Sequence, residues 1–270
     1  MSLTETRDEL IDAIQSNLSA LLVPVSIQAV AAELEEVAGW FQSLGICNLL
    51  LYAEPDRLYE NLVRSGHTRR YFLSRSLTEG KSGDYQLAIS RWDSFLDVVA
   101  AGHFTLAREL ATLSTTAWVP AGEYEDDFLY RHFLQQFIAP PAPEQAARLR
   151  ATLDRWRAWL DGPPPPRLDC CEALLAREAA AFAAAFEDLI EARQAEIAKQ
   201  QKMALAADLN FAPRSAIHVE GLALLRIAQA LGFALEPDYP LCPGLARLPA
   251  VKPWPADLYP LLEAERDPYP

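Results

Sequence analysis

The segment Ile217–Leu245, IHVEGLALLRIAQALGFALEPDYPLCPGL, limits the fold more than any other stretch of the chain. Apolar residues recur through its first half, and Gly232 follows them, which predicts a buried helix with a glycine stop. Prolines at 237, 240 and 243 predict a clamped, non-helical tail. Since a helix this apolar has to be covered by other elements, the segment predicts a multi-helix core.

The rest of the chain has the same helical character. Glycine occurs only 11 times in 270 residues, and no segment alternates polar and apolar residues as a half-buried strand would. We therefore expect an all-α fold, either an irregular multi-helix bundle or a short α-solenoid of helical hairpins.

Breaks in the periodicity mark the expected helix boundaries. Gly45 should end the second helix, and the short apolar run 46–52 fits either a helix turn or a strand. Trp156 and Trp159 are three residues apart and should share a face. The expected helices cover residues 4–22, 26–44, 55–76, 85–100, 104–113, 123–138, 144–161 and 167–207, the last with a bend or break.

The clearest linker is Gly162–Pro166, where four prolines follow a glycine. Such a run favours stiff polyproline II structure. We expect 1–270 to be one helical unit, or two subdomains, 1–161 and 167–270, joined by this linker.

Acidic residues are concentrated near the amino terminus. The formal net charge is −13, and residues 1–60 carry ten acidic and two basic side chains. An acidic surface repels nucleic-acid phosphates but speeds association with a basic protein, so we expect a protein partner and no direct nucleic-acid binding. The candidate contact residues are Glu5, Asp8, Glu9, Asp12, Glu33, Glu35 and Glu36, with Glu123, Glu125, Asp126 and Asp127 as a second group.

Motifs for catalysis or cofactor binding are missing from the sequence. It has no GxSxG elbow, GxxxxGK[ST] or GxGxxG loop, and no HExxH. The four histidines are far apart in sequence, so we predict no catalytic residues, no metal site and no cofactor.

Polar residues at the start of the apolar helix are the best candidates for a buried network. Glu220 could pair with Arg214, and His218 lies between them. We predict that Arg214, His218 and Glu220 fix the helix entrance. The alternative is an acid–base pair of His218 and Glu220, which would need a pocket.

Neither an apolar signal core nor a run of 18 apolar residues occurs. We therefore expect a cytoplasmic protein that does not span a membrane.

Two segments carry a family resemblance. One is the hairpin YQLAISRWDSFLDVVAAGHFTLARELATLS at Tyr85–Ser114, and the other is HVEGLALLRIAQALGF followed by DYPLCPGL. Together they resemble the forty-ninth immunity family of bacterial polymorphic-toxin systems. The resemblance implies a non-enzymatic antitoxin that binds a cognate toxin delivered by a secretion machine such as type VI. Combined with the acidic charge and the expected cytoplasmic location, it favours a basic nuclease as the toxin.

Two other functions remain open from the sequence. One is an α-helical adaptor or chaperone for secretion cargo. The other is an all-helical enzyme that uses His218 and Glu220.

Overall fold

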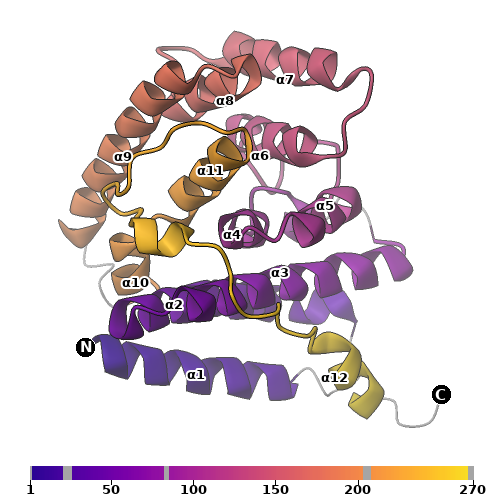
Figure 1. Ribbon diagram of the computed structural model, residues 1–270. Helices are drawn as coiled ribbons and strands as arrows, with labels where there is room; N and C mark the ends of the chain where they lie inside the picture. Colours follow the sequence, from indigo (N-terminus) through magenta and orange to yellow (C-terminus); the bar gives the residue numbers. More distant parts are fainter. Residues whose placement is uncertain (1, 21–25, 82–84, 203–207, 267–270) are drawn as a thin grey trace.

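The computed structural model describes residues 2–20, 26–81, 85–202 and 208–266. Within these ranges it contains twelve α-helices, three short 3-10 helices and no strand, which confirms the predicted all-α fold (Figure 1). None of the helices in the described ranges combines the length and the hydropathy needed to cross a membrane. The α-helices are α1 (Leu3–Ala20), α2 (Ala31–Tyr52), α3 (Pro55–Thr78), α4 (Ser94–Ala101), α5 (Phe104–Leu113), α6 (Glu125–Ile138), α7 (Gln145–Trp159), α8 (Pro166–Ala176), α9 (Ala179–Lys202), α10 (Phe211–Ala216), α11 (Val219–Ala230) and α12 (Tyr259–Arg266).

The helices pack in irregular layers. Helices α1, α2 and α3 lie along one side, α4, α5 and α11 occupy the middle, and α6, α7 and α8 lie on the opposite side (Figure 1). Helix α9 runs along the flank, and the chain then returns so that α12 lies beside the α1–α3 layer. Adjacent layers are in contact through α3 with α4, and through α5 with α6, while α4 and α11 pack against each other within the middle layer.

Helix α11 lies at the centre of the hydrophobic core, as its apolar sequence predicts. Leu222, Leu224 and Leu225 are fully buried, and they belong to a cluster with members both before and after the proline run at 162–166. A smaller cluster between α1 and α2 includes Leu10, Ile14 and Phe41. Burial of apolar side chains on this scale is the main favourable contribution to folding.

The predicted helix end at Gly45 is wrong. Helix α2 continues through this residue to Tyr52, so the run 46–52 is helical. Gly45 instead allows α3 to approach, because a Cβ atom there would lie 3.0 Å from the carbonyl oxygen of Leu58. The helix ends where Ala53 adopts a left-handed conformation with φ of 53°.

The helix predicted for 85–100 is also shorter than expected. Residues 85–87 form a single 3-10 turn (η2), and α4 begins at Ser94. The buried guanidinium of Arg69 donates to the carbonyl oxygens of Gln86 and Leu87 at 2.7 and 3.2 Å, which satisfies backbone acceptors that a helix would have used. The break predicted between the helices at 85–100 and 104–113 is confirmed, because Gly102 ends α4 with φ of 85°.

Two further predictions concern the region after residue 144. Trp156 is buried, but Trp159 is 45% exposed near the end of α7, so the two rings do not share one packed face. The predicted break within 167–207 is confirmed, because Arg177 adopts a left-handed conformation between α8 and α9. Residues 203–207 lie outside the described ranges.

Close packing of α3 against α4 generates a stability prediction. A Cβ atom on Gly66 would lie 2.1 Å from the Cγ2 atom of Val98. Gly66→Ala should therefore lower the free energy of unfolding by about 1–2 kcal/mol in urea denaturation, although alanine favours the helix. Ser74→Ala on the exposed face of α3 is the control and should change stability by less than about 0.5 kcal/mol. A Gly66→Ala protein as stable as the parent would contradict this packing.

Candidate functional site

Two neighbouring clefts are lined by charged and polar side chains from distant parts of the chain. The first has a volume of about 570 Å³ and is lined by residues on or beside α4, α6, α8, α9, α10 and α11. The second, of about 360 Å³, lies between α2, α3 and α4. Asp93, Asn210 and Arg214 line both clefts, so the two are adjacent.

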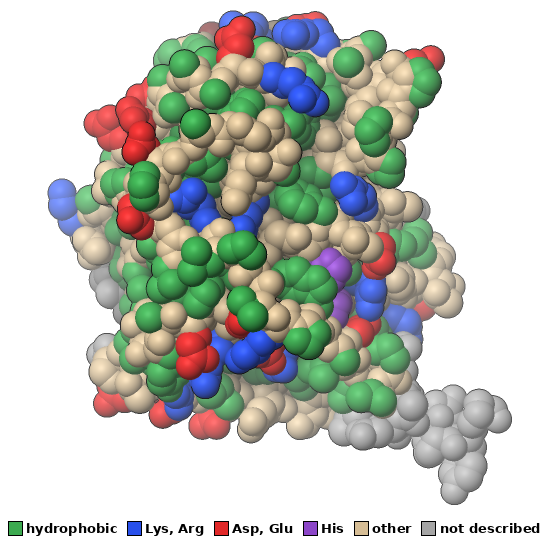
Figure 2. Space-filling model, viewed as in Figure 1, with side chains coloured by type: hydrophobic (Ala, Val, Ile, Leu, Met, Phe, Trp, Pro, Cys, Tyr) green, Lys and Arg blue, Asp and Glu red, His purple; other side chains and the backbone are tan. Residues whose placement is uncertain are grey.

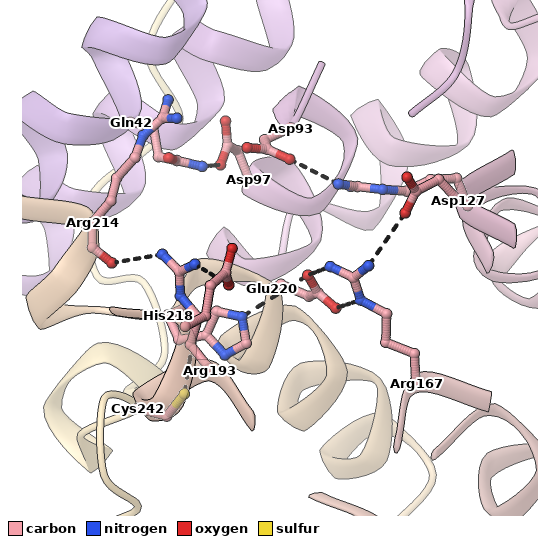
Figure 3. A network of polar contacts seen from close by, with 12 residues as sticks. Gln42, Asp93, Asp97, Asp127, Arg167, Arg193, Arg214, His218, Glu220 and Cys242 are labelled. Atoms are coloured by element: carbon pink, nitrogen blue, oxygen red, sulfur yellow. Dashed lines mark hydrogen bonds and ion pairs between the residues drawn. The ribbon is translucent and has the colours of Figure 1, made fainter. Parts of the chain in front are cut away.

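An ion pair between Arg167 and Glu220 joins α8 to α11 at the edge of the first cleft (Figure 3). The Nε and Nη2 atoms of Arg167 donate to the two carboxylate oxygens of Glu220, each at 2.6 Å. Pro165, in an extended conformation, leads directly into α8 and places Arg167 in the first turn. Burial alone would raise the pKa of Glu220, but Arg167 outweighs it and holds the pKa at about 2.

The predicted pair between Arg214 and Glu220 is wrong. Arg214 points away from Glu220 and donates from Nη2 to the carbonyl oxygen of Gly39 at 3.3 Å. Gly39 leaves room for this contact, because a Cβ atom there would lie 2.8 Å from Nη2. No carboxylate among the described residues forms an ion pair with Arg214.

His218 joins the start of α11 to the tail that follows it. Its backbone N–H donates to the carbonyl oxygen of Leu241 at 2.8 Å, and the Cys242 thiol donates to its carbonyl oxygen at 3.4 Å. Burial lowers the pKa of His218, so the ring is neutral at pH 7. Its Nε2 atom lies 3.9 Å from Glu220, beyond hydrogen-bond distance. With Glu220 ionised and held by Arg167, this arrangement does not favour acid–base chemistry.

Asp97 lines the second cleft and was not singled out from the sequence. Its side chain is only 1% exposed, and its carboxylate accepts hydrogen bonds from Gln42 Nε2 at 2.5 Å and Ser65 Oγ at 2.6 Å. Burial, with a further contribution from Asp93, raises the pKa of Asp97 to about 7. The available signal was a lone carboxylate within the apolar run of α4, SFLDVVAA. Arg167 had no comparable signal, because only the fold brings it to Glu220.

The first group of predicted contact residues lies on α1 and α2, and two of its members, Glu35 and Glu36, also line the second cleft. Figure 2 shows acidic side chains at the lower edge of the molecule, where Figure 1 places α1. Glu35 is half-buried and forms an ion pair with Arg91 at 3.1 Å. The six exposed members are Glu5, Asp8, Glu9, Asp12, Glu33 and Glu36.

Most side chains of the second group of predicted contact residues already have polar partners within the fold. Glu123 is buried and accepts backbone N–H groups of Ser90 and Val119 at 3.0 and 3.3 Å. Glu125 pairs with Arg155, and Asp127 with Arg167. Only Asp126 has no polar partner within the described ranges, so this group does not form a free acidic surface.

Side chains that could ligate a metal are scattered through the fold. No group of three or more His, Cys, Asp or Glu side chains in the described ranges is placed to hold a metal ion. The four cysteines are buried free thiols.

Comparison with known families gives the chain a functional context. A family model described as Immunity protein 49 matches residues 51–245, which is more than half of the chain. Neither a curated protein nor a solved structure matches. The matched region includes Asp97, Arg167 and Glu220, whereas α1 and most of α2 precede it.

The Arg167–Glu220 pair predicts a measurable loss of stability. Glu220→Gln should lower the free energy of unfolding by about 2–3 kcal/mol at pH 7, because Arg167 loses its main partner in a partly buried site. The double substitution Arg167→Met, Glu220→Leu should recover most of that loss. Arg157→Gln, which breaks an exposed pair with Glu172, is the control and should cost less than about 1 kcal/mol. Equal losses from Glu220→Gln and Arg157→Gln would contradict a special role for the buried pair.

Asp97 predicts an unusual pH dependence of stability. Because its pKa is raised in the fold, the native state binds the extra proton, and stability should fall as pH rises from about 4 to 7. This one group contributes a slope of about 1.4 kcal/mol per pH unit in that range. Asp97→Asn should remove this contribution and make the protein more stable than the parent at pH 8. Thermal unfolding at pH 5 and pH 8 tests both points, and an Asp97→Asn protein less stable than the parent at pH 8 would contradict them.

Proposed function

This chain belongs to the immunity protein 49 family, and from that premise we propose that it neutralises a toxin by direct binding through the acidic face of α1 and α2. Membership supports a role as an immunity protein of polymorphic toxin systems with a toxin as its partner, and we propose that this role is non-enzymatic. The proposal goes further in assigning the surface, the class of toxin and the place of action.

The exposed acidic side chains on α1 and α2 are the observation that supports this face as the toxin-binding surface. Glu9, Asp12, Glu33 and Glu36 have no ion-pair partner among the described residues, so their charges are available to another molecule.

The charge of this face favours a basic toxin, and we propose a nuclease that acts in the cytoplasm after delivery by a secretion machine such as type VI. A nuclease needs a positively charged groove for its phosphate substrate. An acidic protein can cover such a groove and associate with it rapidly. We propose no direct contact between this chain and nucleic acid.

The two other functions considered from the sequence receive less support. A chaperone for apolar secretion cargo would need an apolar groove, whereas charged side chains line much of both clefts. An enzyme using His218 and Glu220 would need an available carboxylate, but Arg167 holds both oxygens of Glu220.

Charge reversal on the proposed face tests the assignment. A combined Glu9→Lys, Asp12→Lys, Glu33→Lys, Glu36→Lys variant should bind the toxin encoded beside this gene about 100-fold more weakly, mainly through a slower association rate. Parent affinity should also fall as salt is raised from about 0.05 to about 0.5 M. Surface plasmon resonance measures both effects.

The matched control reverses four exposed acids on or beside α9: Glu178→Lys, Glu187→Lys, Asp188→Lys and Glu191→Lys. It should change affinity by less than about threefold, apart from the general effect of net charge. If the two variants lose affinity equally, the α1–α2 face is not the binding surface. If the parent protein neither binds the toxin nor protects cells that express it, the proposed function fails.

A further inference from the structure

We propose that the second cleft, between α2, α3 and α4, receives a lysine or arginine side chain of the toxin, with Asp97 as its counter-ion. This inference rests on the proposed function, because it names the chemistry of one contact with that same partner. It adds one buried contact, at Asp97, to an interface that is otherwise made by exposed acidic side chains.

Asp97 lacks the cation that a buried carboxylate normally has. Its side chain is almost completely buried, and its two hydrogen-bond donors, Gln42 and Ser65, are both neutral. No lysine, arginine or histidine among the described residues forms an ion pair with it. An ionised carboxylate without a cation is costly to bury, and a cation supplied by a partner would remove that cost.

The other charged groups of the cleft are mostly committed to one another. Arg91 on the approach to α4 pairs with Glu35 of α2, and Asp93 pairs with Arg131 of α6. Glu36 of α2 is exposed and lines the same cleft without a cationic partner among the described residues. Glu36 therefore adds a second negative charge to the cleft that can attract a basic side chain.

Arg214 of α10 is the remaining charge that lines the cleft, and it donates to the Gly39 carbonyl oxygen. Figure 3 shows its guanidinium beside Gln42, on the side of the network that includes Asp97. This positive charge weakens the attraction of the cleft for a free cation. We therefore assign the site to a side chain that a docked protein holds in place, rather than to a metal ion.

Trp92 provides an independent indication of a ligand in the same cleft. Its side chain is only 3% exposed, and its indole Nε1–H has no acceptor among the described residues. A buried donor without an acceptor is rare in folded proteins. A peptide carbonyl would satisfy it, and the Nε atoms of Arg91 and Arg214, which also line the cleft, likewise lack an acceptor among the described residues. The cleft therefore offers a site for a cation at Asp97 and unsatisfied donors for a carbonyl. A basic residue on a segment of the toxin carries both groups.

The experiment compares toxin affinity between pH 6 and pH 8 for the parent and for Asp97→Asn, using the toxin encoded beside this gene. Because only ionised Asp97 attracts a cation, parent affinity should rise about tenfold over this range. Asp97→Asn should bind at least about 30-fold more weakly than the parent at pH 8, with little dependence on pH. Circular dichroism establishes that the variant is folded, and Asp154→Asn on the exposed face of α7 is the matched control.

Each outcome decides the question. A parent affinity that does not change with pH, or an Asp97→Asn variant that binds as tightly as the parent at pH 8, would overturn the inference while leaving the proposed function intact. Failure of the parent itself to bind would instead remove the proposed function. Pull-down of a toxin fragment that lacks lysine and arginine would also contradict a basic anchor.

Discussion

Glu220 is a carboxylate in the first turn of a helix that is otherwise almost entirely buried and apolar, and Arg167 makes its burial tolerable. The pair ties α11, at the centre of the core, to α8. Arg167 also contacts Asp127, which extends the connection to α6 (Figure 3). Its guanidinium lies over the ring of Tyr130, another residue of α6. Because α11 packs in turn against α4 and α9, its position affects both clefts.

Asp97 is a second carboxylate inside the fold, but unlike Glu220 it has no cationic partner among the described residues. Its partners are a hydroxyl and an amide instead of a guanidinium. Ion pairing therefore lowers the pKa of one carboxyl to about 2, and burial raises that of the other to about 7. A buried acid without a cation lowers the stability of the folded protein. Such destabilising residues are expected where the side chain serves binding.

Local patterns predicted the helices well, because periodicity and glycine stops depend on neighbouring residues. The apolar run of α11 and the turn at Gly102 are examples. The misjudged end at Gly45 depended on α3, which packs against that glycine from elsewhere in the chain. Contacts between distant parts of the chain also decide the candidate site. The sequence indicates a role for Glu220, but the partner of Glu220 lies 53 residues away. Glu123 is buried, and its position in an acidic run does not predict that burial.

Binding of the toxin to the α1–α2 face and the adjoining cleft is tested most directly by hydrogen–deuterium exchange of the free and toxin-bound chain. We predict slower exchange in α1, in the first half of α2 and in residues 88–97, with no change in α7. Protection confined to α7, α8 and α9, with α1 and α2 exchanging as in the free chain, would contradict it.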